Sequence, residues 1–392
     1  MTDMFNIAVV TTSRADYGIY ASLLKELAAE AKVNLSLIVG GMHLAPQFGM
    51  TIEMIEKDGY HIAAKVPCMD AGDDDVSIAN SMGIAVSGFA KSLDELRPDL
   101  IVVLGDRYEM HASALAALPF RIPVAHIHGG EETEGAIDNA LRHSMTKLSH
   151  VHFCSTDLAA SRIRAMGENP DYISVSGAPA LDTILSANTM SRGAWCERFV
   201  VPEEEFVLLT YHPVTLSPEE TLQDFEQVWQ AMNATGMNIV LTLSNADTSG
   251  QTLNSRLRAL AKEHPHVTLV ENMGAHGYYS AMKHAKVMVG NSSSGIIEAA
   301  SFGLAVINVG ERQKGREVSP NVIQTDTDSA AILEGLRRAI TPQFQQMCAK
   351  LVNVYGDGQA AGRIKAGLIK FLDSGANVRK SFYMNGGTDE LA

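Results

Sequence analysis

The sequence is poor in cysteine and has no long apolar run. Its 392 residues include only four cysteines, and no two of them form a C-x-x-C pair. Such wide spacing excludes a disulfide framework and favours buried free thiols in a reducing compartment. No apolar run is long enough to cross a bilayer, and the first residues carry no basic cluster. We therefore expect a cytoplasmic protein without a signal peptide or a membrane span.

Basic residues and cofactor motifs are also scarce. Lysine and arginine total 31 against 45 aspartates and glutamates, so the net charge is −14. This charge argues against a nucleic-acid partner and requires local groups to hold any anionic ligand. The chain has neither a G-x-x-x-x-G-K-S/T loop nor a strand-bound G-x-G-x-x-G with a downstream acid, which excludes ATPases and dehydrogenases. Without histidine or cysteine clusters in ligand spacing, we expect no metal and no cofactor.

The chain does contain short apolar runs that alternate with longer helical stretches. The runs are continuous, which is typical of strands buried on both faces of a parallel sheet. Two sets of them predict two Rossmann-like, doubly wound α/β domains, at residues 1–180 and 204–360. Residues 361–392 are expected to form a helix that packs back on the first domain, followed by a tail. The predicted strands are Ile7–Val10, Leu35–Val39, Leu100–Leu104, Val124–Ile127, Val151–Cys154, Ile173–Val175, Phe206–Leu209, Ile239–Leu243, Val267–Val270, Val287–Val289 and Val306–Val309.

Polar clusters follow most of these strands. In open α/β sheets, ligands bind at the carboxyl ends of the strands, so clusters from both halves favour a single cleft between two facing domains. Within them we select Asp16, His43, His128 and Asn245 as candidate binding residues. The clusters are Thr11–Gly18, Gly40–His43, Gly105–Glu109, His128–Gly135, Thr210–Pro213, Ser244–Asp247 and the segment that begins at Gly290.

The segment Val287–Gly303 is the most informative, because a strand runs into three serines at a predicted helix start. Free N–H groups and the helix dipole favour an anion there, while a plain N-cap is the alternative. Glu298 lies one turn beyond Ser294, and a capping box would instead need a partner at Ile297. We predict that Glu298 binds sugar hydroxyls. The predicted phosphate-binding residues are Asn291, Ser292, Ser293, Ser294 and Gly295.

The candidate reaction chemistry lies with carboxylates of the first half. Asp106 ends a buried strand, and Glu131, Glu134 and Asp138 occupy a glycine-flanked loop that leads into a helix. Several acids in one cleft can divide general acid and base roles, although loop capping is the alternative for Asp106 and Asp138. His212, after the first strand of the second half, is expected to face these acids.

Arginines follow strands in both halves of the chain. Arg14 and Arg107 lie in the first half, and Arg312 and Arg316 lie in the second. One guanidinium group can donate to two phosphate oxygens at once, so we predict that these four arginines hold an anion. A surface ion pair is the alternative for each arginine taken alone.

Taken together, these motifs resemble the hydrolysing UDP-N-acetylglucosamine 2-epimerases, especially the sialic-acid-pathway branch. The resemblance covers most of residues 7–325. It implies a fold like that of GT-B glycosyltransferases, a UDP-linked substrate held mainly by the second domain, and a homodimer or homotetramer. The matching motifs are Thr12–Tyr17, Gly41–Leu44, Gly105–Arg107, His126–Glu131, Ile137-Asp138, Arg142-His143, Thr146-Lys147, His212-Pro213, Gly290–Gly295, Glu298, Gly310–Gln313 and Gly315-Arg316.

The resemblance also implies a reaction. UDP-N-acetylglucosamine and water would give N-acetylmannosamine and UDP, by elimination of UDP through a 2-acetamidoglucal and addition of water. By position, Asp106, Asp138 and a loop acid would form the acid/base set, and His212 would assist UDP departure. Arg14 and Arg107 would help to hold the diphosphate.

Two points stay open at the level of the sequence. Some relatives have a glutamate where this chain has His128, so the loop function could come from Glu131, Glu134 or His128 itself. The substrate could instead be a nucleotide-linked 2,4-diacetamido-2,4,6-trideoxyglucose of a legionaminic-acid pathway, because nothing identifies the residues at C4 and C6. A GT-B glycosyltransferase is a further alternative, but sugar transfer does not require the acids of the first half.

Overall fold

The computed structural model divides the chain into two compact units. Unit 1 comprises Met1–Thr183 and Tyr355–Ala392, and unit 2 comprises Ile184–Val354. Two predicted site residues, Glu134 and Asn245, lie outside the residues that the structure describes. No helix in the described part of the chain is long and apolar enough to span a membrane. The described residues are 4–46, 49–69, 75–132, 138–213, 218–243 and 248–384.

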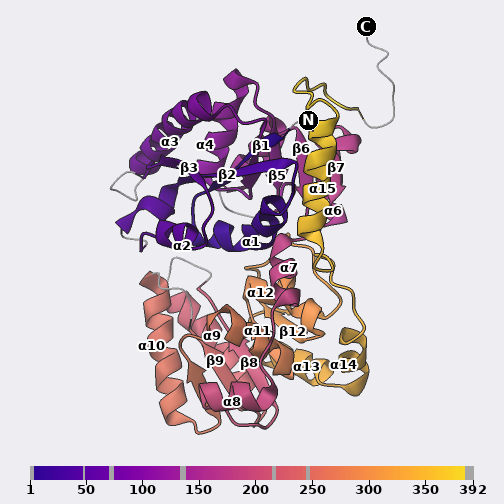
Figure 1. Ribbon diagram of the computed structural model, residues 1–392. Coiled ribbons are helices and arrows are strands. Elements are labelled where there is room, and N and C mark those ends of the chain that lie inside the picture. Colours follow the sequence, from indigo (N-terminus) through magenta and orange to yellow (C-terminus); the bar gives the residue numbers. More distant parts are fainter. Residues whose placement is uncertain are drawn as a thin grey trace. The chain divides into compact units, whose positions relative to one another are not determined.

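Unit 1 is built on a seven-stranded parallel sheet with the order β3-β2-β1-β4-β5-β6-β7 (Figure 1). The order reverses at β1, which lies between β2 and β4. In doubly wound sheets, ligands bind outside the carboxyl ends of the strands at such a point. The strands are β1 (Phe5–Thr11), β2 (Val33–Gly40), β3 (Ile62–Val66), β4 (Leu100–Leu104), β5 (Val124–Ile127), β6 (Val151–Cys154) and β7 (Ile173–Val175).

The last helix, α15, belongs to unit 1 and packs against α1. Lys365 on α15 pairs with Glu26 on α1 at 2.6 Å. The carboxylate of Asp182 caps the first turn of α15, accepting the N–H of Ala360 at 2.9 Å and that of Ala361 at 2.7 Å. The helices of unit 1 are α1 (Arg14–Ala28), α2 (Ile52–Lys57), α3 (Asp75–Leu96), α4 (Tyr108–Ala117), α5 (Asp138–Leu148), α6 (Asp157–Ala165), most of α7 (Pro179–Ser186) and α15 (Ala360–Asp373), with 3₁₀ turns η1 (Gly41–Leu44), η3 (Leu118–Phe120) and η4 (Pro170–Tyr172).

Unit 2 has a six-stranded parallel sheet with the order β10-β9-β8-β11-β12-β13, which reverses at β8. The stretch before β8 contributes a helix, α8, whose Trp195 is buried in the core of this unit. The strands are β8 (Phe206–Thr210), β9 (Asn238–Thr242), β10 (Val267–Val270), β11 (Val287–Gly290), β12 (Ala305–Val309) and β13 (Val322–Thr325). The helices are α8 (Arg192–Phe199), α9 (Pro218–Asn233), α10 (Thr248–Glu263), α11 (Gly274–His284), α12 (Ser293–Ile297), α13 (Ser329–Ala339) and α14 (Pro342–Cys348), with the 3₁₀ turn η5 (Ala299–Phe302).

The predicted doubly wound α/β class is confirmed in both units. The sequence analysis missed β3 and β13, which lie at the edges of their sheets. An edge strand is covered less completely, so it tolerates polar residues such as Lys65 in β3 and Gln324 in β13. Neither strand therefore shows a continuous apolar run.

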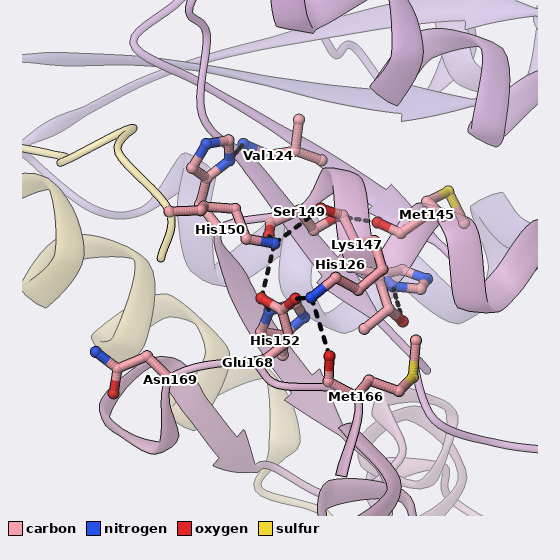
Figure 2. A network of polar contacts seen from close by, with 12 residues as sticks. Val124, His126, Met145, Lys147, Ser149, His150, His152, Met166, Glu168 and Asn169 are labelled. Atoms are coloured by element: carbon pink, nitrogen blue, oxygen red, sulfur yellow. Dashed lines mark hydrogen bonds and ion pairs between the residues drawn. The ribbon is translucent and has the colours of Figure 1, made fainter. Parts of the chain in front are cut away.

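A buried ion network ties the segment after α15 to unit 1, around Glu168 (Figure 2). The Glu168 carboxylate accepts hydrogen bonds from Lys147 at 2.6 Å and His152 at 3.2 Å, and Lys380 lies 2.7 Å away. Lys380 also donates to the Ser149 carbonyl at 2.6 Å. Burial raises the pKa of Glu168, but the bonds from His152, Lys147 and Lys380 outweigh it and hold the pKa at about 2. The ionised carboxylate thus joins α5, β6 and the C-terminal segment.

Glu168→Gln should lower the free energy of unfolding by about 3 kcal/mol at pH 7, because it leaves the ammonium groups of Lys147 and Lys380 without their buried counter-charge. A pKa below the unfolded value of 4.5 gives stability that is present above that pH and is lost as the pH falls toward 2. Urea unfolding at pH 7 and pH 3 should show the gap between the two proteins shrinking. A gap of constant size would contradict the assignment. Glu56→Gln, which breaks an exposed pair with Lys65, is the control and should change stability little.

Candidate active site

The loop after β1 is closed by the carboxylate of Asp16. This buried group accepts hydrogen bonds from the hydroxyl of Thr11 at 2.6 Å, the hydroxyl and N–H of Thr12 at 2.9 Å, and the N–H of Ser13. Burial raises the pKa of Asp16, but bonds from His43, Thr11 and Thr12 outweigh it and lower the pKa below its ordinary value. Asp16 therefore shapes the loop and has its carboxylate committed to internal donors.

His43 lies beneath the same loop. It is buried on η1, and its ring nitrogens contact the hydroxyls of Thr11 at 3.0 Å and Thr51 at 2.7 Å. Arg14, the first residue of α1, is exposed. Of the three predicted binding residues in this region, the structure thus presents Arg14 to solvent and uses Asp16 and His43 inside the fold.

Arg107 stands at the carboxyl end of β4 and is oriented by Glu109. The buried Glu109 carboxylate accepts from the Arg107 guanidinium at 2.8 and 3.2 Å. Burial lowers the pKa of Arg107, but Glu109 more than offsets it, so the pKa is raised and the cation is permanent. Just over a third of the Arg107 side chain remains exposed. The sequence analysis missed Glu109, although its place in the first turn of α4 puts it within reach of Arg107.

The neighbouring Asp106 is paired with Arg142, a residue to which the sequence analysis gave no role. Arg142 is buried on α5, and its guanidinium pairs with the Asp106 carboxylate and donates to the backbone carbonyl of Glu131 at 2.7 Å. It thereby links the end of β4 to the loop after β5. Asp138, the first residue of α5, is partly exposed and lies one turn before Arg142 on the same helix.

His128 and Glu131 form a hydrogen-bonded pair in the loop after β5. The Nδ1 of His128 lies 2.6 Å from a Glu131 oxygen that also accepts from the Ser155 hydroxyl at 2.6 Å. His128 has a φ of +63°, a left-handed conformation that is unusual away from glycine and concentrates at functional sites. His126 is instead a core residue, because its side chain is fully buried and contacts the Gly105 carbonyl at 2.8 Å. This burial lowers its pKa to about 3.

In unit 2, a cavity of about 360 Å³ opens at the carboxyl ends of β8 and β11, where the strand order reverses. These strands approach so closely that a Cβ at Gly290 would lie 1.8 Å from the Thr210 carbonyl oxygen, and φ is +137° there. Only glycine fits this position. The residues that line the cavity are Thr210, His212, Thr242, Leu243, Val270, Glu271, Asn272, Met273, Gly274, Ala275, Tyr278, Tyr279, Ser292, Ser294 and Glu298.

The helix that begins at the serine tract is shorter than the predicted anion site requires. α12 begins at Ser293 and has only five residues, so its dipole is small. Ser292 is its N-cap and accepts the Ser294 N–H at 3.4 Å, as the capping alternative describes. The hydroxyls of Ser292 and Ser294 nevertheless line the cavity, whereas Ser293 and the buried Gly295 are not among its lining residues.

Asn291 holds the backbone of His212 in place. Its side-chain amide accepts the His212 N–H at 2.7 Å and donates to the His212 carbonyl at 2.8 Å. The carbonyl of Asn291 in turn accepts from Arg312 at 3.0 Å and Gln313 at 2.9 Å. Arg316, also predicted to bind, is partly buried in the same loop. Asn291 is therefore placed to position His212 at the cavity.

Glu298 presents a partly exposed carboxyl group to the cavity. Burial raises its pKa to about 7. Within the described residues, no hydrogen-bond donor or cation contacts this carboxyl group. A carboxyl group that has lost much of its contact with water and gained no protein donor is costly to ionise, so the position is suited to a ligand that supplies hydroxyl donors.

Comparison with known proteins identifies the family. The model of the UDP-N-acetylglucosamine 2-epimerase family matches residues 25–369. A Legionella pneumophila protein named UDP-N,N'-diacetylbacillosamine 2-epimerase (hydrolyzing) is 39% identical over 359 residues, covering 91% of this chain and 93% of that protein. The Campylobacter jejuni GDP/UDP-N,N'-diacetylbacillosamine 2-epimerase (hydrolyzing) is 36% identical, covering 82% and 84%. A Neisseria meningitidis UDP-N-acetylglucosamine 2-epimerase is 32% identical, covering 86% and 88%.

The fold agrees with these sequence matches. The crystal structure titled as a putative UDP-N-acetylglucosamine 2-epimerase from Listeria monocytogenes has a TM-score of 0.77 at 18% identity, covering 97% of this chain and 100% of that one. Two parallel α/β units, each with a reversal of strand order, define a GT-B-like architecture. The chain belongs to the UDP-N-acetylglucosamine 2-epimerase family and is a hydrolysing nucleotide-sugar 2-epimerase, so the resemblance found in the sequence is confirmed.

Glu298→Gln should stabilise the unliganded protein at alkaline pH. The folded state keeps the Glu298 proton up to about pH 7, whereas the unfolded chain releases it near 4.5, so ionisation costs stability as the pH rises through this range. Glutamine lacks this cost, which is on the order of 2–3 kcal/mol at pH 8. Urea unfolding at pH 4.5, 6 and 8 should show the gap opening with pH. Parallel pH profiles would refute the assignment, and the exposed Glu311→Gln provides a matched control.

Proposed function

We propose that this enzyme acts on UDP-N,N'-diacetylbacillosamine, a UDP-linked 2,4-diacetamido-2,4,6-trideoxyglucose. With water, the reaction gives UDP and the free sugar with C2 inverted. The observation that carries this choice is the identity to two relatives, one named for UDP-N,N'-diacetylbacillosamine and one for its GDP- or UDP-linked form. Both identities exceed that to the Neisseria meningitidis UDP-N-acetylglucosamine 2-epimerase. UDP-N-acetylglucosamine, the first choice from the sequence, becomes the second candidate, and the alternative from the same analysis is preferred.

The cavity of unit 2 supports nucleotide binding. Its volume of about 360 Å³ lies in the range of small-molecule sites. The two ribose hydroxyls would donate to Glu298 and supply the hydrogen-bond partners that the described residues do not give its carboxylate. The diphosphate would lie near Ser292, Ser294 and His212, with Arg312 as a nearby cation. Hydrogen-bond donors preorganised around a leaving diphosphate stabilise the charge that develops on it.

Residues at the carboxyl ends of β4 and β5 are suited to the proton transfers of this reaction. A base must remove the C2 proton as UDP leaves, and an acid must return a proton to C2 as water adds to C1. We assign these steps to Asp106, Asp138 and the His128–Glu131 pair. Arg142 fixes the Asp106 carboxylate, and Glu131 orients the His128 ring so that its Nε2 can exchange a proton. His128 thereby serves where some relatives have a glutamate.

The substrate assignment is tested by supplying UDP-N,N'-diacetylbacillosamine and UDP-N-acetylglucosamine separately and following the products by proton NMR. We expect free UDP and the 2-epimeric sugar from the first, at a kcat/KM at least tenfold above the second. The Asp106→Asn protein, purified identically, serves as the blank for contaminating activity. Turnover of UDP-N-acetylglucosamine alone would overturn the proposal.

His128→Glu should keep part of the activity, because it places a different acid/base group in the same loop. Carboxyl groups ionise at lower pH than imidazoles, so the acid limb of the kcat/KM profile should move to lower pH. His128→Ala, the matched control without an ionisable group, should lose about 100-fold or more. Rates measured from pH 4.5 to 9 decide the matter: an unshifted profile in His128→Glu would exclude His128 from proton transfer.

A further inference from the structure

A continuous chain of hydroxyl groups runs along the cavity wall of unit 2. The Thr242 hydroxyl, at the end of β9, donates to the Thr210 hydroxyl at the end of β8, with a distance of 2.8 Å. Thr210 lies 3.3 Å from the Tyr278 hydroxyl on α11. Tyr278 lies 2.8 Å from the Ser294 hydroxyl, which lies 2.9 Å from that of Ser292. All five residues line the cavity.

The number of protons in this chain does not match its number of contacts. Each hydroxyl has one proton, and Thr242 uses its proton on Thr210. The other four hydroxyls form three hydrogen bonds with one another, and each bond needs one proton. One of their four protons is therefore left over. An acceptor that enters the cavity can take this proton, and its position then sets the direction of the remaining hydrogen bonds.

Tyr278 is the central member of the chain and remains a donor at neutral pH. Burial raises the pKa of Tyr278, and hydrogen bonding with Ser294, Thr210 and, to a smaller extent, Ser292 offsets this only in part. The neighbouring Glu298 does not take the free proton in this structure, because no donor among the described residues contacts it. The cavity therefore combines an oriented O–H donor with a separate acceptor.

We propose that Tyr278 and Thr210 are positioning residues. Their hydroxyls orient those of Ser294 and Ser292, so that the last hydroxyl of the chain donates a hydrogen bond to the diphosphate of the bound nucleotide. The nature of the ligand rests on the proposed function, whereas the hydroxyl chain is a property of the structure. Hydrogen bonds aligned in one direction strengthen one another, and a preorganised donor gains strength as charge builds up on the leaving group. Tyr278 thus affects both UDP affinity and the rate of UDP departure.

Tyr278→Phe removes one link and keeps the ring. We expect about fivefold weaker UDP binding by calorimetry, as for the loss of one net hydrogen bond. Uridine, titrated by NMR, should bind within about twofold of the natural protein, because it has no phosphate to accept the proton. The value of kcat should fall more than KM rises. Equal losses for UDP and uridine, or an unchanged UDP affinity, would refute the proposal.

Thr210→Val and Thr210→Ser provide a second, matched pair. Valine removes the hydroxyl at nearly constant volume and should reproduce the Tyr278→Phe pattern, whereas serine keeps the hydroxyl and should retain UDP affinity. This pair decides the question if Tyr278→Phe does not fold, as judged by circular dichroism. If Thr210→Val loses UDP affinity but the natural protein does not turn over UDP-N,N'-diacetylbacillosamine, only the substrate assignment would be overturned. If the natural protein turns over this substrate but the variants keep their UDP affinity, only the proposed role of the hydroxyl chain would be overturned.

Discussion

Parallel strand pairing at the two points where strand order reverses is the constraint on which both sites depend. β1 lies between β2 and β4, and β8 lies between β9 and β11. Successive crossovers leave each pair in opposite directions, so their loops diverge and open a crevice at the carboxyl ends. Asp106 and Arg107 follow β4, and Ser292 follows β11, so each of these residues lies at the crevice of its own unit. The close contact at Gly290 shows how little room the pairing leaves beneath the cavity.

Burial has opposite consequences for the carboxylates of this protein, depending on their partners. Asp16 and Glu168 are surrounded by donors, so they remain ionised and stabilise the fold. Glu298 is partly exposed at the cavity wall, but the described protein residues supply it with no donor, and desolvation raises its pKa toward neutrality. The first arrangement is that of structural groups. The second carries a cost in the unliganded protein that a ligand with hydroxyl groups can offset.

The chemistry proposed for unit 1 depends on residues that orient other residues. Arg142 fixes Asp106, Glu109 fixes Arg107, and Glu131 fixes His128. Each orienting group is itself well buried or hydrogen-bonded, so the side chain that it holds has few alternative rotamers. The same principle operates in unit 2, where Asn291 holds the His212 backbone. Proton transfer requires positions accurate to a fraction of an ångström, which flexible surface side chains do not provide.

The sequence by itself determined the fold class, most strands and the main candidate residues. Central strands such as Leu100–Leu104 are buried on both faces, and this forces a continuous apolar run that any reader of the sequence can recognise. Position after a strand then singled out Asp106, His128 and the serine tract. The edge strands β3 and β13 escaped detection, because solvent relaxes the requirement for apolar residues and each contains a polar residue that breaks its apolar run.

Only the tertiary structure decided how these groups are used. Asp106 and Arg142 are 36 residues apart along the chain, and the five hydroxyls come from four separate segments, so no spacing rule connects them. The contact of His43 with the Thr11–Asp16 loop and the desolvation of the Glu298 carboxyl group likewise follow from packing between segments that are distant in the sequence. Hydrogen bonding and desolvation depend on which atoms meet in space, and sequence periodicity reports only which face of an element is covered.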